Sequence, residues 1–438
     1  MLTIVIVAAF VAGYACIALE SVIKVNKAAV ALLMFVACWT LLMMAPGIYF
    51  PGIHDAAGAA IDAIEDSLGE TSTTLFFLMG AMTIVEVVDQ NGGFNFVRDL
   101  LGTTSKRKLL WRIAFMTFLL SAILDNLTTS IVLIMVLRKL VPQRQDRIIY
   151  DAIIVIAANS GGAFSPIGDV TTIMLWNGGM ITAGMTILHL LLPSLMSILI
   201  PTAALQFGLK GELQQPQPMS GVTSEQELTS WERKTVFVLG VGGLIFVPVF
   251  RYLTGLPPFM GILLVLAMLW ITTELFYAHL KVEEKASHRV ARLLSHIDMA
   301  TILFFLGILM AVSCLKHIGV LTSLGQWLDN TSGGNHYLVT GVIGIISSIV
   351  DNVPLVAGCM GMYPMAAAGD MAVDGTFWQL LAYCAGVGGS MLIIGSAAGV
   401  VVMGLEGITF GWYLKRITPI ALVGYVAGMM CYWLQQLL

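Results

Sequence analysis

Long apolar runs alternate with short polar segments along the whole chain, and runs of about 20 residues recur from end to end. A helix needs about 20 apolar residues to cross the hydrocarbon core of a bilayer. The runs are continuous rather than alternating, which disfavours a β-barrel. The pattern therefore predicts an all-α polytopic membrane protein. Uninterrupted helices are expected at 2–22, 28–50, 73–91, 181–206, 235–252, 259–279, 299–316 and 417–437.

Polar islands interrupt two further apolar segments in the first half of the chain. Segment 113–137 carries Asp125-Asn126 at its centre, followed by Thr128 and Thr129. Segment 149–176 carries a longer island, whose members are Asn159, Gly161, Gly162, Pro166, Gly168, Asp169, Thr171 and Thr172. An ionisable group at membrane depth is costly, and its default interpretation is a functional site.

Basic residues lie on both sides of segment 113–137. Lys and Arg concentrate in cytoplasmic loops, so both ends of this segment are expected on the same side of the membrane. Its 25 residues are too few for two full crossings. We therefore predict a re-entrant helical hairpin with Asp125-Asn126 at its tip. One continuous helix is the alternative, and Asp125 or Asp169 could also serve only as helix caps.

The same arrangement returns in the second half of the chain. Leu75-Phe-Phe-Leu78 matches Leu303-Phe-Phe-Leu306 at an offset of 228, and Asp125-Asn126 matches Asp351-Asn352 at an offset of 226. The glycines Gly161, Gly162 and Gly168 match Gly388, Gly389 and Gly395 at an offset of 227. Three ordered matches at nearly one offset indicate an internal repeat. The match is imperfect, because Asn159 aligns with Gly386 and Asp169 with Ser396.

These matches predict two repeats of five helices and one hairpin each, about ten transmembrane helices in all, two of them broken. The first covers 1–206, with hairpin 113–137 and broken helix 149–176; a cytoplasmic linker covers 207–234; the second covers 235–438, with hairpin 337–366 and broken helix 377–404. The loops beside the second hairpin are nearly free of basic residues, so it is expected to open to the outside. The repeats are therefore inverted, with both termini outside, as in many secondary transporters.

Hairpin tips and broken helices expose backbone groups that lipid cannot satisfy, so they persist only around a cavity or a ligand. The glycines and Pro166 are expected to let the helices unwind there. Carboxylate, amide, hydroxyl and carbonyl oxygens suit Na⁺, Li⁺ or H⁺ rather than soft metals. Asp125, Asp169 and Asp351 can each hold either a proton or a metal cation, and this competition is the minimal machinery of antiport.

Composition excludes several other classes of protein. The chain of 438 residues is 11% charged, whereas a soluble protein carries about 25%. Its six cysteines show no CxxC and no paired Cys/His spacing, which argues against a disulfide or metal framework. No cluster of basic and aromatic residues suggests nucleic acid.

The motifs resemble those of NhaD-type sodium/proton antiporters of the ion-transporter superfamily. The resemblance is carried by Ser121 through Thr129, Asn159 through Trp176, Ser347 through Leu355 and Gly388 through Gly404. It implies a bacterial inner-membrane homodimer, surrounded by lipid, that is not an enzyme, needs no cofactor and exchanges Na⁺ or Li⁺ for H⁺. It implies sodium contacts at Asp125, Asn126, Asp169 and Asp351. Further contacts with the cation or proton are implied at Asn159, Thr171, Thr172, Ser347, Asn352 and Ser390.

Three alternatives stay open. Efflux of an oxyanion such as arsenite, or sodium-coupled dicarboxylate transport, occurs in the same superfamily, but an anion site needs positive charge or helix N-termini. The sequence places no Lys or Arg beside either tip. An intramembrane aspartyl protease is disfavoured because Pro166 replaces the first glycine of a Gly-x-Gly-Asp motif. A channel is disfavoured because two re-entrant elements imply occluded sites.

Overall fold

The structure is a computed structural model, and it describes residues 1–18, 23–93, 97, 100–141, 143–209, 211–213, 228–279 and 290–437. This part of the chain forms helices and no β-strand. Five of its helices are long and apolar enough to cross a membrane, or six if the bent pair α20–α21 is one span. The prediction of an all-α polytopic membrane protein is confirmed. Most of the predicted linker, 214–227, lies outside the described residues.

The elements follow one another in two similar series. The first series is α1 (Leu2–Ala18), α3 (Lys27–Met43), α4 (Ala56–Gln90), α6 (Lys106–Leu124), α7 (Asn126–Leu140), α8 (Arg144–Ala163), α9 (Val170–Asn177) and α10 (Ala183–Gln206). The second is α11 (Ser230–Thr254), α12 (Pro258–Phe276), α14 (Val290–Leu293), α15 (Met299–His317), α16 (Val320–Ser332), α17 (His336–Ser347), α18 (Asn352–Met362), α19 (Thr376–Gly388), α20 (Ala397–Glu406), α21 (Phe410–Arg416) and α22 (Thr418–Gln435). Short 3-10 turns lie at Pro46–Ile48, Tyr277–His279 and Leu294–His296.

Two polar segments that lie outside the expected helices are also helical. The acidic stretch before residue 73 is the first half of α4, which Asp55 caps by accepting a hydrogen bond from Gly58 N at 2.9 Å. The segment between His317 and His336 contains α16. An apolar run indicates which part of a helix can lie in the membrane, not where the helix begins or ends. Ala, Leu and Glu favour helix in water as well, so a helix can continue into a polar segment. The first hairpin is also longer than predicted, since α6 and α7 span 106–140.

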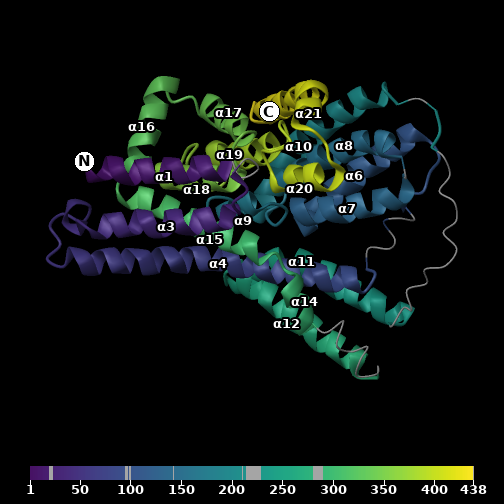
Figure 1. The fold of residues 1–438 in the computed structure, drawn as a ribbon, viewed down its shortest axis with the longest axis horizontal. Coiled ribbons are helices and arrows are strands. Elements are labelled where there is room, and N and C mark those ends of the chain that lie inside the picture. Colours follow the sequence, from purple (N-terminus) through teal and green to yellow (C-terminus); the bar gives the residue numbers. More distant parts are fainter. Residues whose placement is uncertain are drawn as a thin grey trace.

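Helix contacts repeat between the two series. Helix α6 packs on α8 as α17 packs on α19, and α1 packs on α3 as α11 packs on α12. Helix α3 lies against α15 and, correspondingly, α12 lies against α4. Figure 1 shows α6 and α7 at one end of the molecule and α16 to α18 at the other, so the two hairpins reach the centre from opposite ends. The exact boundaries of the repeats stay a prediction.

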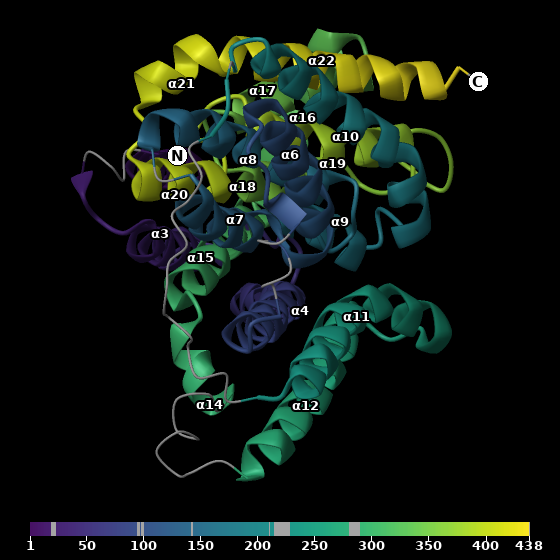
Figure 2. The ribbon, with the colours of Figure 1, turned by 90° about the vertical axis from the view of Figure 1, so that its right-hand side faces the viewer.

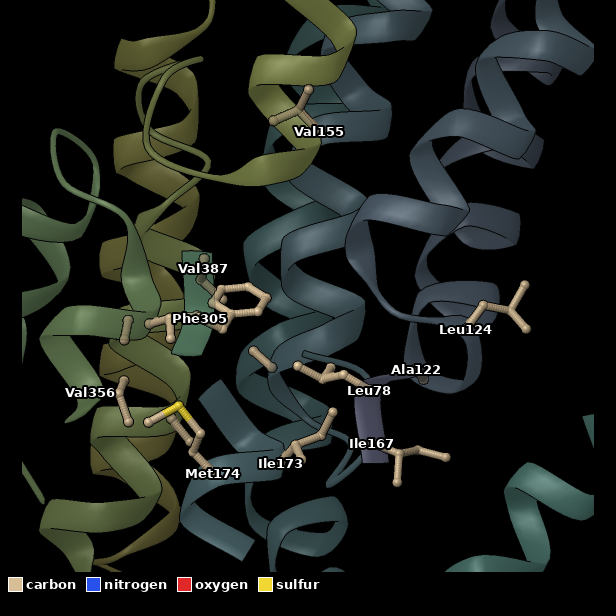
Figure 3. Close-up of a cluster of buried hydrophobic side chains, with 14 of the residues drawn as sticks. Leu78, Ala122, Leu124, Val155, Ile167, Ile173, Met174, Phe305, Val356 and Val387 are labelled. Carbon is tan, nitrogen blue, oxygen red and sulfur yellow. The ribbon is translucent and has the colours of Figure 1, made fainter. Parts of the chain in front are cut away.

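Figure 2 shows α11 and α12 at one edge of the molecule, separated from α10 and α22 by α4 and the hairpins. Between these edges the two series share one apolar core. Figure 3 shows Leu78 of α4, Ile173 of α9, Phe305 of α15, Val356 of α18 and Val387 of α19 in a single cluster. All five side chains are buried. The hairpin tips and helix breaks are therefore held by packing from both halves of the chain.

Candidate functional site

The tip of the first hairpin is a single residue. Helix α6 ends at Leu124 and α7 begins at Asn126, and Asp125 between them has a φ of 75°. A positive φ is uncommon for a residue other than glycine. The half-buried Asp125 carboxylate accepts hydrogen bonds from the N–H and the hydroxyl of Thr128, both at 2.8 Å. These bonds cap α7 and fix the carboxylate at the tip.

The tip of the second hairpin carries the same residue types in another setting. Asp351 has a φ of −51° and caps α18 by accepting from Val353 N at 3.2 Å. Its Oδ2 also lies 3.6 Å from Nζ of Lys27, which sits 4.4 Å from the centre of the Phe304 ring. The expectation that no Lys or Arg lies at either tip is wrong. Lys27 is the first residue of α3, and a lone lysine at the start of an apolar run gave no signal of this contact.

Asp169 lies where both hairpin tips meet the first broken helix. It precedes α9, is only 1% exposed, and its Oδ1 accepts from Thr171 N at 3.3 Å. Its Oδ2 accepts from Nδ2 of Asn126 at 3.4 Å and from Nδ2 of Asn352 at 3.0 Å. One carboxylate oxygen therefore receives an amide from each half of the chain.

Asn159 extends this network to the second broken helix. Its Oδ1 accepts from Asn126 Nδ2 at 3.3 Å, and its Nδ2 donates to Ser396 Oγ at 2.9 Å. Ser396 caps α20 at the position equivalent to Asp169. We did not predict Ser396 as a site residue, although its alignment with Asp169 was the available signal.

The remaining predicted residues divide into two groups. The hydroxyls of Thr129 and Thr171 are buried and have no hydrogen-bond partner in the described part of the chain. Those of Thr172, Ser347 and Ser390 donate to backbone carbonyls. All five hydroxyl oxygens keep lone pairs that a cation can contact, because donating a hydrogen bond uses only the hydrogen. Thr129 and Thr171 differ in that their hydroxyl groups take part in no hydrogen bond among the described residues.

The predicted glycines fall into two groups, one inside the helices and one in the breaks. Gly161 lies inside α8, and the helix breaks only at 164–169, around the buried Pro166. A Cβ at Gly161 would lie 2.2 Å from Phe118 O, and a Cβ at Gly388 would lie 2.2 Å from Gly344 O. A Cβ at Gly168 or Gly395 would likewise lie within 2.7 Å of a hairpin carbonyl. All four glycines let a hairpin pack closely on its broken helix. Gly168 and Gly395 in addition lie in the non-helical segments where the two helices break, as predicted, whereas Gly161 and Gly388 are helical.

The charges around the network do not balance. Among the described residues, neither Asp125 nor Asp169 has a Lys or Arg partner, whereas Asp351 has Lys27. The end of α8 adds a partial negative charge and the start of α9 a partial positive one. The site therefore attracts cations when its two unpaired carboxylates are ionised, and holds buried oxygens that can contact them.

Known proteins resemble this chain over most of its length. Residues 14–380 match the family described as citrate transporter. Sodium/proton antiporter 1 of Arabidopsis thaliana is 44% identical over 96% of this chain and 70% of its own length. Sodium/proton antiporter 2 of the same plant is 41% identical over 96% of each chain. The Na(+)/H(+) antiporter NhaD of Vibrio cholerae is 31% identical over 97% of this chain and 90% of its own.

The chain therefore belongs to the citrate transporter family, and it is similar to Na⁺/H⁺ antiporters that include one of the NhaD type. The predicted resemblance is confirmed. The protein is a multi-pass membrane transporter and not an enzyme.

Proposed function

We propose that this member of the citrate transporter family exchanges Na⁺ for H⁺ across its membrane. The observation that carries the proposal is the buried carboxylate of Asp169, which the amides of both hairpin tips contact. A transporter must expose one site to each side in turn. A carboxylate that contacts both hairpins is suited to this, because movement of either hairpin changes its surroundings.

In this mechanism Asp125 and Asp169 bind either protons or a cation. When ionised they attract Na⁺, and when protonated they are neutral and release it. The amides of Asn126 and Asn352 donate to Asp169; half a turn of either amide presents its carbonyl oxygen to the cation instead. The free hydroxyl oxygens of Thr129 and Thr171 complete a set of hard donors.

The finer parts of the proposal rest on the sequence. Li⁺ is expected to replace Na⁺, because it has the same charge and prefers the same oxygen ligands. The basic flanks of the first hairpin support an orientation in which it opens to the cytoplasm and both termini lie outside. The matched helix contacts support two inverted repeats. A homodimer in a bacterial cytoplasmic membrane is proposed by family resemblance alone.

Proton flux in proteoliposomes tests the proposal. Adding Na⁺ or Li⁺ outside acid-loaded vesicles should alkalinise the interior, as a pH-sensitive dye reports. The Asp125→Asn and Asp169→Asn variants should lose this response while the protein stays folded. Asp62→Asn, an exposed acid on α4, is the matched control and should keep it. Wild-type protein that moves no protons with any alkali cation would refute antiport.

Transport of a carboxylate anion is the second candidate, because the matching family is described as citrate transporter and Lys27 lies at a hairpin tip. Lys27 already contacts Asp351, and two further carboxylates surround the site. An anion would therefore meet net negative charge. Uptake of labelled citrate by wild-type vesicles, stimulated by Na⁺, would favour this candidate over antiport.

A further inference from the structure

Another buried aspartate lies outside the network described above. Asp151, in the second turn of α8, has no exposed surface, and neither of its carboxylate oxygens has a hydrogen-bond partner in the described residues. Buried carboxylates are normally paired or hydrogen-bonded, because burying an unpaired charge is costly. Asp151 therefore has no evident structural task that explains its presence.

Asp151 lies beside a network of arginines at the end of the molecule. Glu406, the last residue of α20, contacts Arg138 of α7 at 2.6 Å and Arg147 of α8 at 2.7 Å. Arg144 donates to the backbone carbonyls of Glu406 and Gly407 at 2.9 and 2.7 Å. The side chain of Arg138 is 37% exposed, whereas that of Glu406 is 1% exposed. The network therefore reaches from solvent to a buried carboxylate.

Among the described residues, the charged groups close enough to act electrostatically on the Asp151 carboxyl group belong to this network. They are Arg138 of α7, Arg144 and Arg147 of α8, and Glu406 of α20. Lys106 of α6 is not part of the network, because its Nζ pairs with Asp146 of α8 at 2.7 Å. Each guanidinium named above already donates to Glu406 or to a backbone carbonyl, and none donates to Asp151.

The helix connects Asp151 with the candidate cation site. Residues four apart lie on one face of a helix, so Asp151, Val155 and Asn159 are aligned. Eight residues correspond to about 12 Å along the axis. Asn159 in turn contacts Asn126 and Ser396. Asp151 thus lies between the solvent-reaching arginines and the buried network around Asp169.

The second repeat has no equivalent carboxylate. At the offset of 227, Asp151 corresponds to Trp378, which is buried and donates through Nε1 to Met371 O at 3.0 Å. The acid is therefore present at only one end of the transport site. If the residue at this position served only to pack the helix, an aspartate in one half and a tryptophan in the other would not be needed.

We propose that Asp151 is a proton-binding site that passes protons between water at the arginine network and the carboxylate of Asp169. In one direction the Asp151 carboxyl group gives up its proton, by way of water, to the Asp169 carboxylate, and the Asp151 carboxylate then takes a proton from the water at the arginine network. In the other direction the same two transfers run in reverse. The ligand is a proton rather than Na⁺, because a metal cation needs several oxygens and the neighbouring guanidinium groups repel it. This inference rests on the proposed antiport and adds its route for protons.

Two flux measurements on the same proteoliposomes test it. Na⁺-driven proton flux needs both the cation site and the proton route, whereas exchange of ²²Na⁺ for Na⁺ needs only the cation site. In Asp151→Asn, proton flux should fall at least about tenfold while Na⁺/Na⁺ exchange stays within about twofold. Asp151→Glu should recover most of the proton flux. The matched control is Asp146→Asn, an acid on the same helix, which should leave both fluxes unchanged.

Two outcomes would overturn the inference. Wild-type proton flux in Asp151→Asn would show that protons take another route. Equal loss of both fluxes in Asp151→Asn, with no recovery in Asp151→Glu, would show a structural role. Wild-type protein that exchanges Na⁺ but moves no protons would instead refute the proposed antiport itself. The melting temperature of Asp151→Asn should not fall, since the substitution removes a carboxylate without hydrogen-bond partners.

Discussion

The two hairpin tips share an Asp-Asn pair but differ in charge. At the first tip Asp125 is held by the N–H and hydroxyl of Thr128. At the second tip Asp351 is held by a backbone N–H and by the ammonium group of Lys27. The neighbouring asparagines behave alike, because both donate to Asp169.

The two halves of the chain thus share the arrangement of their hairpins and differ in the charges at the hairpin tips. The amides that join the hairpins to the centre are present in both halves. The uncompensated charge lies in the first half, because Asp169 corresponds to Ser396 and Asp351 carries its own cation. We therefore expect the first half to exchange the transported cation and proton, and the second half to shape the site.

The largest effect is expected from substitution of the central acid and its counterpart. Asp169→Asn should lower Na⁺-driven proton flux by at least about 1000-fold, because it removes the carboxylate that both tips contact. Ser396→Ala should lower it less than about tenfold, since the hydroxyl oxygen accepts only neutral hydrogen bonds, from Asn159 and from Gly399 N. Initial rates of dye-reported flux measure both. If both variants lost the same amount of flux, Asp169 and Ser396 would be equally important and the two halves would not differ at this position.

The next largest effects are expected from substitution of the acids at the two hairpin tips, and their sizes should differ. Asp125→Asn should lower the flux about 100-fold, because this carboxylate has no Lys or Arg partner among the described residues. Asp351→Asn should lower it about tenfold, because Lys27 already offsets its charge. Rates at saturating Na⁺ compare the two variants. A reversed order would assign the exchange to the second tip.

The close-packing glycines should behave alike in both halves. Gly161→Ala and Gly388→Ala each place a Cβ 2.2 Å from a hairpin carbonyl. Such overpacking costs about 1–3 kcal/mol. The melting temperature in detergent should fall for both, whereas Gly184→Ala, which has open space around it, should leave it unchanged. If the melting temperature fell for only one of the two variants, the halves would share the course of the backbone but not the close packing of hairpin on helix.

The smallest effect is expected at the lysine. Lys27→Gln frees Asp351 to attract cations and should lower the apparent KM for Na⁺ about threefold. Lys27→Arg keeps the charge and should leave KM unchanged. Na⁺ titrations of the flux give both values. An unchanged KM in Lys27→Gln would mean that the ion pair does not affect the cation site.

Much of the architecture could be read from local pattern. The apolar runs predicted the membrane helices, and the recurrence of Asp-Asn and of the glycines predicted two related hairpins. The ends of α4 and the existence of α16 could not be read this way. Hydropathy marks continuous apolar runs, and a helix that mixes polar and apolar residues, such as α16, does not form one.

The sequence by itself determined the fold class, the two hairpins, the broken helices and the acids Asp125, Asp169 and Asp351. These follow from hydropathy, turn-forming residues and the cost of burying charge, all of which are local properties. Only the tertiary structure decided which groups meet. It brought Lys27 to Asp351, joined Asn126 and Asn352 at Asp169, and left Asp151 buried beside the arginine network. Such contacts join residues up to several hundred positions apart, and packing of whole helices, not sequence spacing, sets them.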